Sequence, residues 1–180
     1  MKIHRNAFNL YLLAAVFLIG CKLPQEKIDA AEARRQKKQM STLRLHLETP
    51  NSLDTQAVSV LRASPILVKV DSDSFLDERD VVSAKVADFM GGFVIQVKFN
   101  DHGKLVLDTT STSNRGRRVA IMSDFGQQRW LAAPILSHRI SDGVLSFTPD
   151  ATREEAQRIV RGLNNTAALI KRQESLLPAW

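Results

Sequence analysis

The stretch from Asn114 to Leu163 constrains the fold more than any other part of the sequence. Within it, short apolar segments alternate with turn residues, a pattern that favours strands. The pair Thr152 and Glu155 has the spacing of a capping box and begins a helix. We expect this helix to end at Asn164–Asn165 and to bury one apolar face, made by Ala156, Ile159, Val160 and Leu163. The order of these features predicts one compact unit.

Period-two alternation predicts further strands earlier in the chain, at residues 43–47, 66–70 and 93–99. In the first of these strands we interpret His46 as an outward-facing residue. Residues 81–89 are compatible with a helix as well as with a strand, and the sequence does not decide between the two. A hairpin-type turn is predicted after them, at Met90–Gly92.

Helices are expected at two further places. The first covers residues 54–62, with Val58 and Leu61 facing inward. The second covers residues 104–112, and its inward residues are expected to be Leu105, Val106 and Thr109. After the final helix of the compact unit, residues 166–180 are expected to form a second short helix or a tail.

The positive charge of the chain is concentrated near its N-terminus. The formal charge is +6, but residues 41–180 hold 17 basic and 16 acidic residues, so the expected domain is nearly neutral. A nucleic-acid-binding domain normally carries a basic patch of its own, so nucleic acid is not an expected partner. Cys21 is the only cysteine, which excludes an internal disulfide. The four histidines are scattered, and no metal or cofactor is predicted.

The first residues have the layout of a secretory signal peptide, with Lys2 and Arg5 ahead of an apolar segment at residues 7–19. This segment is short for a membrane span, which needs about 20 residues. The run Leu18-Ile19-Gly20-Cys21 resembles the lipobox of bacterial lipoproteins. The resemblance implies removal of residues 1–20 and attachment of lipid to the Cys21 thiol.

We therefore expect an anchored protein of the bacterial cell envelope that faces the periplasm. Lys22 stands where Asp would favour retention in the inner membrane, so the outer membrane is slightly favoured. A plain signal peptide, or a short uncleaved helix with an incidental cysteine, is the alternative. Residues 21–40 then form a helical or disordered tether. Its basic residues either contact anionic lipid headgroups or are simply solvated; they are Arg34, Arg35, Lys37 and Lys38.

A second resemblance covers about residues 65–164. The matching pieces, in order, are Asp80–Ala84, Phe93–Phe99, Asp101–Gly103, Gly116–Ile121, Ala133–Pro134, Ile140, Asp142–Gly143, Phe147–Thr148 and Thr152–Ala156. In order and spacing they resemble the head subdomain of the first large periplasmic domain of SecD, an accessory subunit of protein export.

This resemblance implies an α+β domain at residues 41–165, in which an antiparallel sheet of ferredoxin-like character carries two helices on one face. It also implies a role in contacting another protein or an unfolded polypeptide. The membrane helices of SecD, and the subdomain that joins its head to the membrane, have no counterpart in this sequence. We therefore expect a head module on a lipid anchor and not a working translocase subunit.

Three functions remain open at this stage. The leading hypothesis is a non-enzymatic lipoprotein whose domain binds protein. Arginine and tryptophan are enriched at interface hot spots, so the candidate interaction residues are Arg115, Arg117, Arg118, Arg129, Trp130 and Arg139. The alternative for these residues is that Trp130 lies in the core and the arginines are solvated.

The second hypothesis is a structural component of an envelope assembly, docked through a sheet edge or through residues 166–180. The third is an enzyme, for which Asp124, His138 and Asp142 would have to converge from adjacent turns. The alternative is that these are ordinary turn acids beside a solvated histidine. No catalytic residue is assigned.

Overall fold

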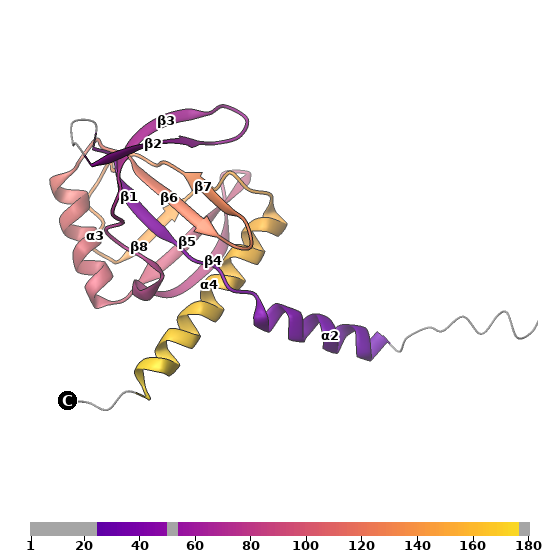
Figure 1. The fold of residues 1–180 in the computed structure, drawn as a ribbon. Coiled ribbons are helices and arrows are strands. Elements are labelled where there is room, and N and C mark those ends of the chain that lie inside the picture. The colour runs from indigo at the N-terminus through magenta and orange to yellow at the C-terminus, as the bar shows by residue number, and fades with distance from the viewer. Residues whose placement is uncertain (1–24, 50–53, 177–180) are drawn as a thin grey trace, which may run out of the picture. The chain divides into compact units, whose positions relative to one another are not determined.

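The computed structural model in Figure 1 describes residues 25–49 and 54–176, and the chain divides into two units after Gln36. Helix α2 (Gln25–Lys38) begins in the first unit, and its side chains from Asp29 onward are exposed. A helix is what its composition favours. The signal peptide and the lipobox, Cys21 included, lie outside the described residues, as do residues 50–52. Among the described residues, no helix combines the length and the hydropathy of a membrane span.

The second unit is an α+β domain, which confirms the expected class. Its strands form three antiparallel sheets, whereas a single sheet was expected. The first sheet has the order β1-β6-β7, with strands at Arg44–Leu47, Val119–Asp124 and Gln128–Ala132. The second is the hairpin of β2 (Thr55–Val60) and β3 (Ile66–Asp71). The third has the order β4-β5-β8, with strands at Val81–Phe89, Gly92–Phe99 and Val144–Phe147.

Two helices and one short 3-10 turn complete the domain. The turn η1 (Glu78–Asp80) precedes β4, helix α3 (Asp101–Ser113) follows β5, and helix α4 (Arg153–Glu174) is the last element. Both three-stranded sheets contribute apolar side chains to one main core, together with these helices. Fully buried members of that core include Leu43, Leu45, Ile95, Val97, Leu107, Ile121, Leu131, Ile159 and Leu163.

Strand β6 is buried on both faces over most of its length. Ile121 belongs to the main core, whereas Ala120 belongs to a second apolar cluster under the β2–β3 hairpin. The second cluster contains Val58, Val60, Val68, Val70, Ala120 and Ala133, with Leu61, Ile66 and Trp130 at its margin. The expected helix at residues 54–62 is therefore wrong. Val58 and Val60 are two residues apart and place both side chains on one face of a strand.

The expectation that His46 faces outward is also wrong. Its exposed fraction is 5%, because the hairpin covers this face of β1. The imidazole Nδ1 lies 2.9 Å from the Asp71 carbonyl oxygen, and the ring meets the Trp130 ring edge-on at 5.3 Å between centroids. The alternation of residues 43–47 predicts that this face of β1 is solvated, but the β2–β3 hairpin covers it.

Helix α3 is confirmed, but its buried face differs from the expected one. Asn100 caps it by accepting a hydrogen bond from the Gly103 N–H at 2.8 Å. Leu107 is the fully buried residue, whereas Leu105 is 65% exposed and Thr109 also faces solvent. The expected inward set was therefore wrong for two of its three members.

Helix α4 begins with the predicted capping box of Thr152 and Glu155. It does not end at Asn164–Asn165, as expected, but continues to Glu174. Its final turns, yellow in Figure 1, extend away from the sheets, and no residue after Thr166 is buried in the described part of the helix. Residues 81–89, left open between helix and strand, form strand β4.

Candidate functional site

Two of the predicted interaction residues, Arg129 and Trp130, contact other parts of the domain. The Arg129 side chain is only 12% exposed, and its guanidinium pairs with Glu155 at 3.3 Å and donates to the Asp150 carbonyl at 3.1 Å. Trp130 packs at the margin of the second cluster against His46. Both residues therefore hold elements together, and neither offers a free surface to a partner.

Two further predicted arginines also have partners inside the chain. The Arg118 backbone N–H donates to the Glu48 carboxylate at 2.8 Å, and its guanidinium donates to the Ala133 carbonyl at 3.1 Å. Arg139 is exposed, but its guanidinium donates to both carboxylate oxygens of Asp108, one of them at 2.7 Å. The Arg139 guanidinium lowers the pKa of Asp108, and the carboxylate in turn raises the pKa of Arg139. Their charges thus largely cancel.

Arg115 and Arg117 remain as exposed cations. They flank Gly116, whose positive φ of 85° makes the tight turn that precedes β6. The Gly116 N–H donates to the Leu136 carbonyl at 2.9 Å, and the Leu136 N–H donates back to the Arg117 carbonyl at 2.9 Å. The turn is therefore bonded directly to the segment that follows β7.

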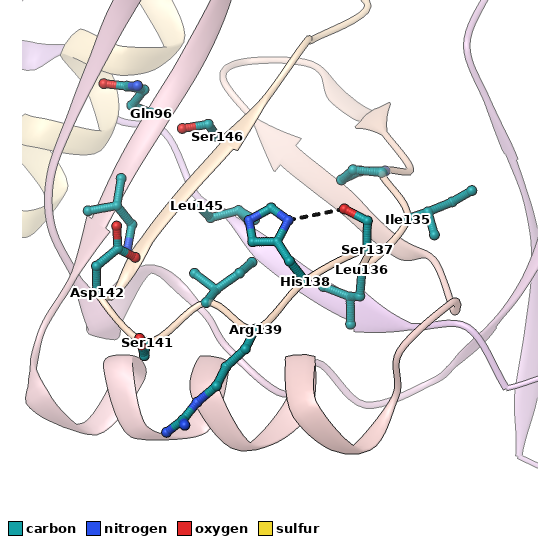
Figure 2. Close-up of a pocket in the computed structure, with 13 residues that line it drawn as sticks. Gln96, Ile135, Leu136, Ser137, His138, Arg139, Ser141, Asp142, Leu145 and Ser146 are labelled. Carbon is teal, nitrogen blue, oxygen red and sulfur yellow. Dashed lines mark hydrogen bonds between the residues drawn. The ribbon is translucent and has the colours of Figure 1, made fainter.

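This segment, Pro134–Asp142, forms one wall of a hollow on the domain. The hollow has a volume of about 500 Å³. Figure 2 shows the segment running around it, with Gln96 of β5 and Ser146 of β8 on the opposite side. It is lined by Gln96, Pro134, Ile135, Leu136, Ser137, His138, Arg139, Ile140, Ser141, Asp142, Val144, Leu145 and Ser146. We call this hollow the β8 groove.

Contacts with α3 hold the outer wall of the β8 groove in place. The Ile140 N–H donates to the Ser111 hydroxyl at 2.9 Å, and Ser111 itself is fully buried. The neighbouring ion pair between Arg139 and Asp108 makes a second link to the same helix. The groove is therefore preformed on one side by a helix-bound segment and on the other by a sheet.

The inner wall is the free edge of strand β8. The Phe99 N–H donates to the Gly143 carbonyl at 2.9 Å, and Val97 pairs with Leu145. Because antiparallel ladders alternate, the backbone groups of Val144 and Ser146 point away from β5. The outward Val144 N–H is satisfied by the Asp142 carboxylate at 3.0 Å. The Ser146 N–H and C=O have no partner among the described residues.

The opposite edge of the same sheet is covered at Ala84 of β4. The Asn164 side chain of α4 accepts from the Ala84 N–H at 2.8 Å and donates to the Ala84 carbonyl at 3.0 Å. A side-chain amide thus replaces a neighbouring strand at β4, which is one way in which proteins protect sheet edges. The sheet accordingly has one covered edge and one open edge, and the open edge lies in the groove.

A smaller hollow of about 270 Å³ adjoins the β8 groove on the solvent face of this sheet. Gln96 and Val144 line both hollows, so the two are continuous. The remaining lining residues come from β4 and β5 and are Ser83, Ala84, Lys85 and Lys98. We refer to this second hollow as the lysine pocket.

The residues named for a possible enzyme do not converge. His138 and Asp142 line the β8 groove, but Asp124 ends β6 and is not part of the lining. The Ser137 hydroxyl lies 3.1 Å from His138 Nδ1, the dashed line in Figure 2, while one Asp142 oxygen accepts the Val144 N–H. Among the described residues there is no group of three or more metal-ligating side chains.

Sequence reasoning missed the residues that shape this site. Val144, Ser146 and Gln96 were part of expected strands, but a sequence does not say which strand becomes an edge. The turn at Asp142–Gly143 was the one available signal, because it starts a strand of only four residues. Of the six candidate interaction residues, the structure brings Arg139 into the lining and places Arg115 and Arg117 beside it.

No protein-family model matches the sequence, and no curated protein matches it either. Two solved structures of SecDF do match the fold. One, described as a membrane component that enhances protein export, has a TM-score of 0.55 and 17% identity over 77% of this chain and 68% of that chain. The other, SecDF in its super-membrane-facing form, has a TM-score of 0.57 and 17% identity over 77% of this chain and 20% of that chain. The protein therefore carries a domain with the SecD-like fold found in SecDF.

Proposed function

We propose that this protein is a lipid-anchored envelope protein whose domain binds polypeptide segments in an extended conformation. The bound segment adds as a fourth strand to the β4-β5-β8 sheet, beside β8. The observation that carries the proposal is the unpaired backbone of Ser146, which faces a preformed groove of about 500 Å³. An exposed strand edge is a template for an incoming strand.

The groove lining suits a ligand that is held mainly through its backbone. Strand addition supplies main-chain hydrogen bonds that any sequence except proline can make. The walls offer apolar contacts from Ile135 and Ile140 and polar contacts from Gln96 and Ser137. Such a mixed lining accepts many side chains and therefore favours a general polypeptide binder over an enzyme with one substrate.

The connection to protein export is part of the same proposal. A solved SecDF structure is described as a membrane component that enhances protein export. The shared fold supports a comparable task for this domain, namely contact with a chain that has not yet folded. The lipobox resemblance at Cys21 supports a position at the membrane surface, where such chains emerge.

Substituting Ser146 by proline tests the binding site. Proline removes the outward N–H but leaves the pairing of Leu145 and Phe147 with β5, so an edge strand tolerates it. We expect the full-length Ser146→Pro protein, purified in detergent, to bind a labelled extended peptide of about ten residues at least tenfold more weakly than the wild type. Fluorescence anisotropy measures the affinity, and circular dichroism checks that the fold is retained.

Ser146→Ala is the matched control, because it removes the hydroxyl and keeps the backbone donor. We expect its affinity for the peptide to equal that of the wild type. Equal binding by a folded Ser146→Pro protein would show that the peptide does not pair with β8, and the proposed function would fail.

A further inference from the structure

We propose that the β8 groove selects acidic polypeptide segments, that is, extended chains rich in Asp and Glu. This inference rests on the proposed function and deepens it, because it names the chemical class of the ligand. It is carried by two groups of cations beside the groove that have no acidic partner within the described residues.

Lys85 and Lys98 form the first group of cations. In the sheet register Lys85 is opposite Gln96, and Lys98 is opposite Ser83, so the two lysines are diagonal neighbours on the solvent face. Both are exposed and line the lysine pocket, whose lining contains no carboxylate. Two like charges at this spacing repel each other, and an acidic ligand side chain would relieve that repulsion.

The position of the lysine pocket links it to an added strand. Val144 pairs with Lys98 and lies on the same face of the sheet. A strand bound beside β8 would lie about 5 Å from it. Its solvent-face side chains would then lie across Val144 from Lys98, two strand spacings or about 10 Å away, which is comparable with the Debye length of about 8–10 Å. Lys85 lies one strand farther, so its contribution is smaller.

Arg115 and Arg117 form the second group, at the wall around Leu136. Their turn is bonded to this wall by the reciprocal hydrogen bonds at Gly116 and Leu136. Both side chains are exposed, and neither forms an ion pair in the part of the chain that the structure describes. An extended segment in the groove therefore has cations both across the sheet and beside the wall at Leu136.

Two carboxylates lie in or beside the groove, and one of them is neutralised by a cation. Asp142 accepts the Val144 N–H, and Asp108 is paired with Arg139. The domain as a whole is nearly neutral, so the excess of free cations at this site is local. Complementary charge across an interface raises the rate of encounter and discriminates against like-charged partners.

Three labelled peptides of one design test the inference on the full-length protein in detergent. In an extended peptide, successive side chains point to opposite faces. All three peptides carry Val and Thr in turn on one face, and the other face carries Glu in the first peptide, Gln in the second and Lys in the third. We expect the Glu peptide to bind about tenfold more tightly than the Gln peptide at low salt, and the Lys peptide to bind most weakly. The preference should shrink as salt is raised.

The double variant Lys85→Glu, Lys98→Glu should abolish the preference for the Glu peptide and leave the affinity for the Gln peptide within about twofold. Lys69→Glu, Lys171→Glu is the matched control. It makes the same change in net charge at exposed lysines outside both hollows, and it should keep the preference.

The possible outcomes separate the two proposals. If all three peptides bind wild type equally, the charge preference is refuted and strand addition stands. If none of them binds, the proposed function fails and the preference fails with it. Vesicles of phosphatidylcholine with phosphatidylglycerol provide a last arm. Here Cys21 is replaced by serine, so that a lipid anchor does not contribute. Sedimentation of this protein, but not of the same protein with Lys85→Glu and Lys98→Glu, with these vesicles, without any peptide preference, would assign the cations to a membrane surface and overturn the inference.

Discussion

At the scale of single residues, polar side chains of α4 form hydrogen bonds with the backbone of the segment that leads into β1. The Thr166 hydroxyl donates to the Ser41 carbonyl at 2.8 Å, and the Asn165 side chain donates to the Gln39 carbonyl at 2.8 Å. Both contacts join residues more than a hundred positions apart in the sequence. These contacts explain why Thr166 is buried. The sequence had predicted that the helix would end just before this residue.

Gly162 makes this close approach possible. A Cβ atom built at this position would lie 2.8 Å from both the Ser41 Cβ and the Ser41 backbone nitrogen. We expect Gly162→Ala to lower the free energy of unfolding by about 1–3 kcal/mol, because the cost of overpacking exceeds the gain of ~1 kcal/mol in helix propensity. Urea denaturation followed by circular dichroism measures the change.

Gln157→Ala on the exposed face of the same helix is the control for this experiment. It should change the free energy of unfolding by less than about 0.5 kcal/mol. A Gly162→Ala protein as stable as the wild type would mean that the segment at Ser41 moves aside at little cost.

At the scale of elements, the start of α4 connects the helix to two sheets. The Thr152 N–H donates to Glu155 at 3.0 Å, and Glu155 also pairs with Arg129 of β7 and, at 3.6 Å, with Arg62 beside the β2–β3 hairpin. The same Arg62 donates its backbone N–H to Asp150 at 2.8 Å. The helix terminus thus holds the hairpin over the second cluster.

The charge of Glu155 makes this junction sensitive to pH. The Thr152 N–H, and then the Arg129 guanidinium, lower the pKa of the Glu155 carboxyl below its ordinary value of 4.5. A carboxyl with a lowered pKa in the folded state stabilises the fold above the unfolded pKa. This contribution is lost as the pH falls below 4.5 and through the lower, folded value.

We expect Glu155→Gln to lower the free energy of unfolding by about 1 kcal/mol at pH 7, since it removes the charge and keeps an acceptor for Thr152. The difference from the wild type should shrink as the pH falls below 4.5. Thermal unfolding at pH 7, 5, 4 and 3 measures both. Glu174→Gln removes one charge at the other end of the helix, and it should not show this convergence. A deficit in Glu155→Gln that persists unchanged at pH 3 would contradict the assignment.

At the scale of the whole molecule, the positive charge is concentrated ahead of the folded domain. The excess of positive charge belongs to the N-terminal region, and the folded domain is nearly neutral. Helix α2 is solvated along the side chains described, as suits a tether between an anchor and a binding domain. In the proposed function the anchor supplies location and the domain supplies recognition, so the two should be separable by mutation.

Replacing the single cysteine tests the anchor. We expect Cys21→Ser to move the protein from the membrane fraction to the soluble or precursor fraction, because lipid can no longer be attached to the thiol. The intact mass of the mature wild-type protein should exceed the mass of its polypeptide by that of the acyl groups. Lys22→Ser, which keeps the thiol, is the control and should stay in the membrane fraction. Unchanged partitioning of Cys21→Ser would sink the lipoprotein assignment.

Much of the domain could be predicted because its signals are local. The hairpin turn at Met90–Gly92, where Met90 and Gly91 have positive φ, follows from the residues of the turn itself. The alternation of residues 93–99 and the capping box at Thr152 also depend only on near neighbours. The order of such pieces was enough to indicate the SecD-like fold that the comparison with SecDF supports.

The failures arose where a distant segment changes the environment of a residue. Residues 54–62 lack a decisive local pattern, and they became a strand because β3 and the second cluster offer a partner and a buried face. His46 alternates as an outward residue, yet the same hairpin covers it. Arg129 looks like a free interface arginine, but Glu155 and Asp150 enclose its guanidinium.

The sequence by itself determined the turns, the helix start and the resemblance at Cys21, because each depends on residues a few positions apart. The α+β class followed from the resemblance to SecD, which depends on the order of such local pieces. Only the tertiary structure decided which strand has an open edge, which cations keep a partner and where the groove lies. Those properties depend on contacts such as Asn164 with Ala84, which close one edge of a sheet from 80 residues away and leave the edge at Ser146 open. No local pattern encodes such a contact, since the chain must first pack before an edge or an unpaired charge exists.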